Sequence, residues 1–571
     1  MEKTKSNISE KLYSLKGFWI FLLSAMYLLP DLYFTFEVDY LTFTHRFFTL
    51  LLSISFFIPL LFIFRNKLKI FTWIVFAISF VLGSFALGLL IFYKARLSVN
   101  TYAAIVNTNS QEAKEFISGY QLPVILMWLT LVFIFILIYK FIPHRLEKKF
   151  AWKSLIASVL LFMISVLYFT RYEEFGYHAF NRQIIRKECY PVYCYEAISS
   201  YRGEAKKLAK NRKIAAKFSF NAVNPDSDSI KKIIVLVIGE SCRKHNWSAY
   251  GYARETTPRL DKRKSIVFFD DAITSHNSTL KSLAIMLTPV GAVNYEDHSK
   301  SRSILHLFSE AGYKTYWLSN QKDEAARLRI HIEDADSIYC TMGFKSITET
   351  LDEVLLPQFK NLLAQKENQF FIVHLNGNHL KYEERYPPEF NVFGKDHAAK
   401  LTKEGYYNVR SKQQVTDYYD NSILYQDFIL DSLTSMIESS NRAGCLLYTS
   451  DHGEDLFDDC RNLTGHGATF TEASFRIPFF VFTNTFFESK YPEKISNLVK
   501  NKNQKIAAGE DIFYSLADLV NINFPSQQLI KSISSVEFSE PEKRMILLPD
   551  NKVAVFEEQV IKEKELIEKC K

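Results

Sequence analysis

The sequence predicts an α-helical membrane domain followed by an α/β domain with a mainly parallel sheet covered by helices. The first third of the 571 residues is strongly apolar, whereas the remainder has the composition of a globular domain. In that remainder, short apolar runs alternate with amphipathic helical patterns, which is typical of parallel strands buried on both faces.

Five apolar segments each have about the 17 to 25 residues that a bilayer core requires. They cover residues 17–36, 47–64, 70–93, 122–139 and 154–170. The first carries Asp31 near one end, and no small-residue cleavage site follows its apolar run. We therefore interpret it as a membrane anchor and not as a cleaved signal peptide.

Positive charge is distributed unevenly between the loops that join these segments. Lys and Arg are frequent before the first segment, between the second and third, and between the fourth and fifth, but sparse in the other loops. Cytoplasmic loops carry such an excess, so the N-terminus is expected in the cytoplasm. An odd number of spans then exports everything after Thr170. The expected parts are a five-helix membrane domain at 1–170, a basic connector at 171–229 and an exported domain at 230–571.

The connector is basic between positions 171 and 217, with aromatic and apolar residues interleaved. This pattern suits an interfacial helix over anionic headgroups, and it equally suits a solvated helical linker. The net charge of +7 is modest for this length and does not indicate nucleic-acid binding. None of the seven cysteines lies in a C-x-x-C zinc pattern, and the close spacing of Cys189 and Cys194 favours a disulfide between them.

In the exported domain, the polar segment 221–229 is expected to lead into a compact fold. Apolar runs at residues 231–239, 314–320, 369–377, 444–453 and 476–482 predict buried strands. Amphipathic patterns at 303–312, 416–440 and 511–522 predict helices. Ligands of such sheets bind beyond the carboxyl ends of the strands, which is where the candidate residues are expected.

A carboxylate and an Asp-His pair are expected at one edge of this sheet. Glu240 ends the first strand in the segment G-E-S, and Asp451 and His452 end another in S-D-H-G-E. Gly453 follows them, and its missing side chain lets the backbone turn tightly and a ligand approach. Oxygen and nitrogen ligands of this kind suit Zn²⁺ with one coordination position left open. The sequence therefore predicts a zinc site.

The open position requires a nucleophile, and Thr279 is the candidate. The apolar residues of the segment 278–287 lie on one helical stripe, so Thr279 stands in the first helical turn. There the backbone N–H groups and the helix dipole favour an anion. A hydroxyl that coordinates a metal loses its proton more readily and can attack a phosphate. Alternatively, Thr279 and Ser278 only cap the helix and have no catalytic role. If a hydroxyl does attack the phosphate, Ser278 and Ser282 compete with Thr279 as the nucleophile.

Two further histidines belong to this set: His379 in G-N-H and His466 in G-H-G. Beside a metal they suggest phosphate contacts, general acid or base catalysis, or a second zinc ion. Taken singly, each would more often be a hydrogen-bonded structural histidine.

Together these segments resemble the phosphoethanolamine transferases of Gram-negative envelopes, which are membrane members of the alkaline phosphatase and sulfatase superfamily. The resemblance covers nearly the whole chain: five spans, a basic connector and an exported hydrolase-like domain. Its motifs are VLVIGES with GYARETTPRL, TYWLSNQ, HLNGNH with ERYP, YDNSILYQDFIL, SDHGE, GHG and RIPFFVF.

The resemblance implies transfer of phosphoethanolamine from phosphatidylethanolamine to a lipopolysaccharide acceptor, a lipid A phosphate or a core sugar, with release of diacylglycerol. The phosphoryl group would pass through a nucleophilic threonine. The enzyme would be a monomer in the bacterial inner membrane, with its catalytic domain in the periplasm. By position, Glu240, Thr279, Asp451 and His452 match the family's zinc ligands, and Thr279 matches its nucleophile. His379 and His466 match the family's phosphate-binding or second-metal histidines.

The resemblance also implies a segment that contacts the donor lipid. The sequence VNTNSQEAKEF matches it with Thr108 and Glu112; Ala104 replaces the Asn that the family has four residues before the threonine, and Asn107 stands nearby. Many members that modify lipid A have cysteines around the nucleophile, and SHNSTLKSLAIML has none. The region around Thr279 is therefore more similar to relatives acting on core sugars or glucans. A lipid A acceptor would confer resistance to cationic peptides such as polymyxin.

Other functions are compatible with parts of this pattern. A phosphoglycerol transferase of the lipoteichoic acid synthase or glucan-modifying type would also have five spans, a metal and a threonine, but GES, SNQ and SDHGE favour the phosphoethanolamine branch. A sulfatase would carry its modified nucleophile in a Cys/Ser-x-Pro-x-Arg motif, which does not occur near Thr279. A non-enzymatic membrane sensor or scaffold is disfavoured because every metal and phosphate candidate is present.

Overall fold

A computed structural model of the protein describes most of the chain in two compact units, Met1–Lys206 and Lys207–Lys571. The division between the units falls inside the stretch 171–229 that the sequence sets apart. The described residues are 16–37, 43–93, 96–97, 102, 121–171, 186, 188–226, 231–322, 326–342, 351–395, 397, 401, 404–467, 469–549 and 552–570.

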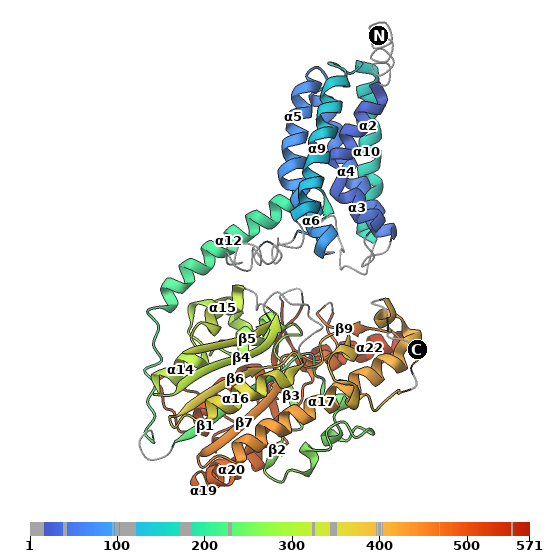
Figure 1. Ribbon diagram of the computed structural model, residues 1–571. Coiled ribbons are helices and arrows are strands. Elements are labelled where there is room, and N and C mark those ends of the chain that lie inside the picture. The colour runs from blue at the N-terminus through green and yellow to red at the C-terminus, as the bar shows by residue number, and fades with distance from the viewer. Residues whose placement is uncertain are drawn as a thin grey trace. The chain divides into compact units, whose positions relative to one another are not determined.

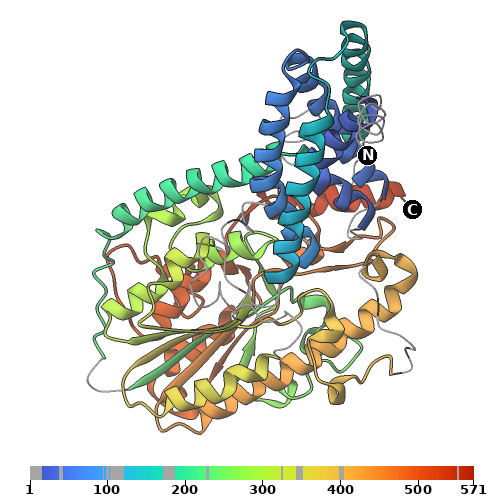
Figure 2. The same cartoon turned by 45° about the horizontal axis from the view of Figure 1, so that its top comes forward.

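The first unit is a bundle of apolar helices that lie side by side in both views (Figures 1 and 2). Among the described residues, four helices are long and apolar enough to cross a membrane, or up to five if a bent helix pair is one span. The predicted helical membrane domain is thus confirmed. The helices are α2 (Lys16–Tyr27), α3 (Leu29–Glu37), α4 (Phe43–Ile63), α5 (Leu68–Ile78), α6 (Ser84–Tyr93), α9 (Gln121–Phe141) and α10 (Lys148–Arg171). The connector helix α12 (Val192–Ala215) spans the division between the two units.

The first predicted span is broken: α2 and α3 meet at an angle of 76°. Pro30 stands at the second position of α3, and a proline there removes a backbone donor and clashes with the carbonyl four residues earlier. The break leaves Asp31 fully buried, where its carboxylate accepts a hydrogen bond from Ser53 Oγ at 2.5 Å. Arg96 forms an ion pair with the same carboxylate at 3.4 Å. The charged residue inside this apolar segment therefore has partners.

The second unit is built on a sheet that has seven strands in the described part of the chain, in the order β2-β10-β7-β1-β6-β4-β5. β7, β1, β6, β4 and β5 are parallel to one another, and β10 is antiparallel to both β7 and β2. This confirms the expected mainly parallel sheet. The strands are β1 (Lys232–Gly239), β2 (Ile266–Phe268), β4 (Lys314–Lys322), β5 (Ser337–Met342), β6 (Gln369–His374), β7 (Ala443–Ser450) and β10 (Phe479–Thr483).

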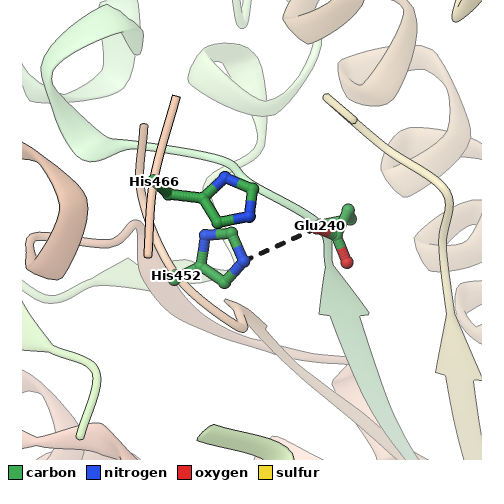
Figure 3. Close-up of side chains that lie close together, drawn as sticks. All are labelled: Glu240, His452 and His466. Atoms are coloured by element: carbon green, nitrogen blue, oxygen red, sulfur yellow. Dashed lines mark ion pairs between the residues drawn. The ribbon is translucent and has the colours of Figure 1, made fainter. Parts of the chain in front are cut away.

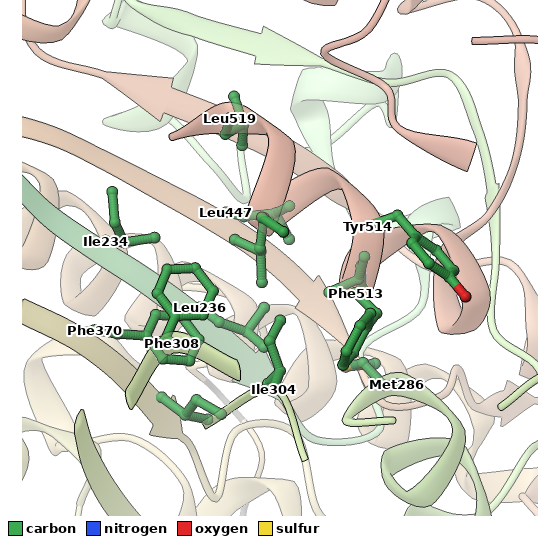
Figure 4. Close-up of a cluster of buried hydrophobic side chains, with 14 of the residues drawn as sticks. Ile234, Leu236, Met286, Ile304, Phe308, Phe370, Leu447, Phe513, Tyr514 and Leu519 are labelled. Carbon is green, nitrogen blue, oxygen red and sulfur yellow. The ribbon is translucent and has the colours of Figure 1, made fainter. Parts of the chain in front are cut away.

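Alternate residues of β1 enter two separate cores, one on each face of the sheet. Ile234 and Leu236 face one core, together with Phe513, whereas Val235 belongs to the other. Figure 4 shows side chains of the first core, among them Ile234, Leu236 and Leu447 of the sheet and Phe513. Helices that contribute to the first core include α13 (Thr279–Met286), α14 (Ile304–Glu310) and α21 (Ala508–Leu519). Helices that contribute to the second include α16 (Leu355–Leu363) and α17 (Lys412–Glu438).

The connection from β7 to β10 departs from the expected alternation of strands and helices. In the described residues between β7 and β10, the longest helix is the four-residue α18 (Glu472–Phe475). A parallel return to the sheet usually needs a crossover helix that packs on one face. The chain instead turns back as an antiparallel strand. The segment 451–478, which includes the short strands β8 (Asp455–Leu456) and β9 (Thr464–Gly465), joins the two strands.

The predicted disulfide between Cys189 and Cys194 is wrong, because both are buried free thiols. Their side chains pack into different apolar clusters, which keeps the two sulfur atoms apart. Among the described residues, a disulfide joins Cys460 to Cys570, whose Cα atoms lie 6.1 Å apart, as a disulfide requires. It ties α22 (Phe556–Cys570) to the loop between β8 and β9. Sequence spacing cannot reveal this pair, because the two cysteines are 110 positions apart.

Candidate metal centre

Side chains from β1, β7 and α13 converge at the carboxyl edge of the sheet. Gly239 at the end of β1 is paired with Ser450 at the end of β7, so Glu240 and Asp451 emerge side by side. Thr279 is the first residue of α13, and its Oγ1 lies 3.3 Å from Glu240 Oε2. The sequence placed these residues at strand ends and in a first helical turn, and the structure brings them together.

The two oxygens of the Asp451 carboxylate differ in their hydrogen bonds with the described residues. Oδ1 accepts hydrogen bonds from the backbone N–H groups of Ser241 at 2.9 Å and His452 at 2.7 Å. Oδ2 is buried and has no hydrogen-bond partner among the described residues. It lies 3.2 Å from His452 Nε2. A buried carboxylate oxygen without a donor is costly unless a cation binds it.

Glu240 and Asp451 place two carboxyl groups in one buried site, where only 2% and 0% of these residues is exposed. Burial and the neighbouring Asp451 carboxylate raise the pKa of Glu240 well above its usual range. A divalent cation between them would remove this repulsion. The arrangement is therefore one that gains stability by binding a metal ion.

The His452 ring is oriented as a metal ligand. Its Nδ1 atom donates to the carbonyl oxygen of Gly453 at 2.9 Å, which leaves the lone pair on Nε2. Nε2 lies 3.6 Å from Glu240 Oε1 and 3.4 Å from Thr279 Oγ1. Burial lowers the pKa of His452 to about 4, so the imidazole is neutral at neutral pH, as metal binding requires.

His466 joins Glu240 and His452 to form a group whose ligand atoms all lie within 4.8 Å of one another, with the two rings side by side (Figure 3). The centres of the two imidazole rings are 4.0 Å apart. His466 Nδ1 contacts Glu454 Oε2 at 2.7 Å. Burial lowers the pKa of His466, but the carboxylates of Glu454, Glu240 and Asp451 together outweigh it and raise the pKa to about 9.

His379 lies near this group without belonging to it. Its Nδ1 atom is buried and has no hydrogen-bond partner among the described residues. Burial and the positive charge of Arg385 lower the pKa of His379, and the charges of Glu454 and His466 also act on its ring. Arg385 Nε donates to the carbonyl oxygen of His379 at 3.1 Å and so fixes this part of the backbone.

The other hydroxyls around Thr279 have different partners. Ser278 Oγ lies 2.8 Å from His276 Nδ1, and Ser282 Oγ donates to the carbonyl oxygen of Thr279 at 3.1 Å. Ser278 is the N-cap residue of α13 but its side chain makes no capping hydrogen bond. Of these three hydroxyls, Thr279 is the one that contacts both Glu240 and His452.

Gly453 is required by a close approach of two backbone segments. A Cβ atom at this position would lie 2.2 Å from the carbonyl oxygen of Ala473. The Gly453 N–H also donates to the carbonyl oxygen of Ser474 at 2.8 Å. The glycine therefore lets the chain after His452 pack directly against the start of α18.

Two residues of this region were not singled out from the sequence. Glu454, two positions after His452, holds His466, and Tyr382 donates to its other oxygen at 2.8 Å. Gln321 donates to Glu240 Oε2 at 3.1 Å. Glu454 and Gln321 lie in the segments SDHGE and TYWLSNQ, which are two motifs of the family resemblance. Their partners become visible only in the folded chain. The predicted donor-contacting residues Thr108, Glu112 and Asn107 lie outside the described residues.

The chemistry of this donor set fits a zinc ion. Zn²⁺ accepts carboxylate oxygen and imidazole nitrogen ligands, and catalytic zinc sites keep one position for a further oxygen. The free Asp451 Oδ2 atom, the neutral His452 ring and the Glu240 carboxylate meet these requirements. The Thr279 hydroxyl lies where the further oxygen would bind.

Comparisons with known proteins agree with this reading of the two units. A sequence profile of the sulfatase family matches residues 232–522, about half of the chain. A second profile, described as phosphoethanolamine transferase EptA/EptB, matches residues 45–205. Phosphoethanolamine transferase EptC of Escherichia coli (strain K12) is 27% identical over 516 residues, which cover 86% of this chain and 87% of the relative.

Solved structures show the same fold. The C-terminal periplasmic domain of EcEptC from Escherichia coli, in complex with Zn, aligns with a TM-score of 0.52 and 29% identity over 59% of this chain and 94% of that chain. The integral membrane protein lipooligosaccharide phosphoethanolamine transferase A (EptA) from Neisseria meningitidis aligns with a TM-score of 0.57 and 19% identity over 89% of this chain and 98% of that chain. The zinc of the EptC domain and the ligand group at Glu240 together support zinc as the metal. The chain belongs to the phosphoethanolamine transferase family of the alkaline phosphatase and sulfatase superfamily.

Proposed function

We propose that the protein transfers phosphoethanolamine from phosphatidylethanolamine to a lipopolysaccharide acceptor, either a lipid A phosphate or a core sugar. The observation that carries the proposal is the position of Thr279. Its hydroxyl lies at the N-terminus of α13, 3.3 Å from Glu240 Oε2 and 3.4 Å from His452 Nε2. The names of the relatives support phosphoethanolamine as the transferred group over phosphoglycerol.

The residues of the centre have distinct roles in this proposal. Zinc, when bound, lowers the pKa of the threonine hydroxyl and withdraws charge from a phosphate under attack. The backbone N–H groups at the start of α13 face the same phosphate. His379 and His466 contact the phosphate or hold a second ion. The zinc ligands are Glu240, Thr279, Asp451 and His452.

The reaction consists of two displacements at phosphorus. In the first, Thr279 Oγ1 forms a bond to phosphorus while the bond from phosphorus to the diacylglycerol oxygen breaks. The proton of the threonine hydroxyl leaves with diacylglycerol. In the second, an oxygen of the acceptor attacks the phosphoryl-threonine, and Thr279 recovers a proton as it leaves. The group transferred keeps its ethanolamine throughout.

The membrane arrangement follows from the same proposal. The N-terminus lies in the cytoplasm, and the second unit lies in the periplasm as a monomer, where it meets donor lipid at the membrane surface. Thr108, Glu112 and Asn107 contact the donor. A phosphoglycerol transferase would require a different donor headgroup at this place.

Replacing the nucleophile tests the proposal. Thr279→Ala is expected to abolish turnover of a fluorescent phosphatidylethanolamine without unfolding the protein, and Ser278→Ala, one residue earlier, is expected to keep it. Intact-mass analysis of the wild type incubated with phosphatidylethanolamine should detect a phosphoethanolamine adduct that Thr279→Ala lacks. Full activity of Thr279→Ala would refute the threonine intermediate. Release of diacylglycerol from labelled phosphatidylglycerol alone would show that the donor is wrong.

A further inference from the structure

Both oxygens of the Glu240 carboxylate accept a hydrogen bond from a neutral donor of the protein. Ser241 Oγ donates to Oε1 at 2.9 Å, and Gln321 Nε2 donates to Oε2 at 3.1 Å. Gln321 belongs to β4, which is separated from β1 by β6. It therefore reaches Glu240 across the end of an intervening strand.

The Gln321 amide nitrogen has two acceptors. The same Nε2 atom donates to the carbonyl oxygen of Leu375, which follows β6, at 2.8 Å. Both neighbours are acceptors, so only the NH₂ end of the amide can face them. The side chain consequently has one orientation, and it links Glu240 to the end of β6.

The backbone of β4 explains why this side chain points to the metal centre. The pairing of β4 with β5 is irregular between Ser319 and Lys322, and Ser319 Oγ accepts a hydrogen bond from the Gln321 N–H at 3.1 Å. A local break in strand pairing, as in a β-bulge, redirects side chains and is frequent next to active sites. The preceding residue, Asn320, instead donates to Asp352 at 2.8 Å.

The chain after Leu375 also holds the backbone of Glu240. The Asn378 N–H donates to the Glu240 carbonyl oxygen at 3.0 Å. A Cβ atom on Gly377 would lie 3.0 Å from the Glu240 nitrogen, so the two backbones are in close contact. The end of β6 thus positions the main chain of Glu240, while Gln321 positions its side chain from the same end.

The type of donor matters, because Glu240 is buried and its negative charge is what a cation would bind. An arginine or lysine in this place would compensate that charge and compete with a metal ion. An amide orients the carboxylate and adds no positive charge.

We propose that Gln321 is a positioning residue of the metal centre, which fixes the Glu240 carboxylate in its metal-binding orientation and leaves its charge to the metal. This inference rests on the proposed function, because it requires a metal at Glu240. Partners of metal ligands of this kind typically contribute about 10- to 100-fold to metal affinity.

The test measures zinc affinity of the full-length protein in detergent by competition with a chromogenic chelator. Gln321→Met keeps the length of the side chain and removes the donor, and we expect it to bind zinc about 10- to 100-fold more weakly than wild type. Gln321→Lys should bind at least as weakly, because its ammonium group competes with the ion. The matched control is Gln369→Met: Gln369 stands at the opposite end of β6, donates to the carbonyl oxygen of Leu362 at 2.8 Å, and should leave zinc affinity unchanged.

A second measurement separates positioning from general stability. Cobalt replaces zinc in such sites, and its visible absorption reports ligand geometry. We expect Gln321→Met to change this spectrum and Gln369→Met to leave it as in wild type. Wild-type zinc affinity and spectrum in Gln321→Met would overturn the role of Gln321 while the proposed function stands. Equal weakening by both methionine variants would also overturn it, and a wild type that binds no zinc would overturn both proposals.

Discussion

The two carboxylate oxygens of Asp451 differ in their contacts: one binds the backbone, and the other is available to a ligand. Oδ1 accepts two backbone N–H groups, and Oδ2 faces His452 without a donor among the described residues. The fold therefore depends on the shape of this side chain, whereas the proposed metal ion would depend on its charge. A substitution that keeps the shape and removes the charge separates the two.

Asp451→Asn is expected to lower zinc affinity strongly while the protein still folds. In chelator-treated samples the variant should be at least as thermostable as wild type, because it removes one of two adjacent buried carboxyl groups. With zinc present, wild type should be the more stable, since a ligand that binds only the folded state stabilises it. Thermal unfolding with and without zinc measures both effects. Greater stability of the wild type in chelator would contradict the repulsion between Glu240 and Asp451.

Asp511, away from the centre, provides a test of pH dependence. Burial raises the pKa of Asp511 to about 8, although its Oδ2 accepts the Ala507 N–H at 2.8 Å. An exposed aspartate has a pKa of about 3.9, so the unfolded chain loses this proton first as the pH rises. The contribution of Asp511 to stability therefore falls between about pH 4 and pH 8.

Asp511→Asn should remove this dependence. The melting temperatures of variant and wild type should differ little near pH 4, and the difference should grow in favour of the variant toward pH 8. Melting curves of the full-length protein across this range provide the measurement. Two parallel curves would show that Asp511 does not titrate as its burial suggests.

At the residue scale, the sequence predicted that Glu240, Thr279, Asp451 and His452 lie close together, because each stands at a point where a strand ends or a helix begins, and the structure brings them together. It did not reveal the role of Gln321 or Glu454. Their partners come from other strands or from a loop folded back on itself. A hydrogen bond across β6 depends on strand order, and one chain alone does not specify which strands become neighbours.

At the scale of elements, α22 holds the loop that leads to His466. The disulfide Cys460–Cys570 fixes one end of this helix. Further along it, Glu563 accepts hydrogen bonds from Arg461 Nη2 at 2.5 Å and from the Glu472 N–H at 2.7 Å. The segments on both sides of His466 are thus attached to one C-terminal helix.

Removing the disulfide by Cys460→Ser with Cys570→Ser should destabilise the second unit by about 2–4 kcal/mol, because the bridge closes a long loop. Reductant should lower the melting temperature of wild type toward that of the double variant and leave the variant unchanged. Chemical unfolding of both proteins measures the difference in free energy, and thermal unfolding with and without reductant measures the shift in melting temperature. A wild type that is indifferent to reductant would argue against the contribution of the bridge.

The strands that the sequence predicted correctly are the strongly buried strands of the sheet. All five predicted strands are present, and each joins the central sheet. The strands β2 and β5 were missed: they lie at the two edges of the sheet, and β5 is largely exposed. β2 is apolar but only three residues long, and β5 lacks a buried apolar run, so neither has the pattern by which the other strands were predicted.

At the scale of the whole molecule, apolar length alone predicted the membrane helices, but not the 76° bend of the first. Pro30 marks the break in the sequence, yet its effect depends on whether neighbouring helices cover the exposed backbone. The burial of Asp31 beside Ser53 and Arg96 likewise depends on packing between segments distant in sequence.

Mass spectrometry of envelope glycolipids can identify the acceptor of the proposed reaction. Envelope glycolipids of cells that contain the protein should carry one added phosphoethanolamine group, which mass spectrometry can assign to lipid A or to the core. Cells with Thr279→Ala should lack it. Addition to lipid A should also raise resistance to polymyxin, because it lowers the negative charge of the surface. Unchanged glycolipids would point to another acceptor, such as a glucan.

The antiparallel direction of β10 has a consequence for how such an enzyme diversifies. The connection between β7 and β10 begins and ends at the same edge of the sheet, so insertions or deletions there leave the order of strands intact. Asp451 and His466 lie in this one connection. Changes in the loop between β8 and β9 can therefore alter the surroundings of His466, while the strands that carry Glu240 and Asp451 keep their places in the sheet.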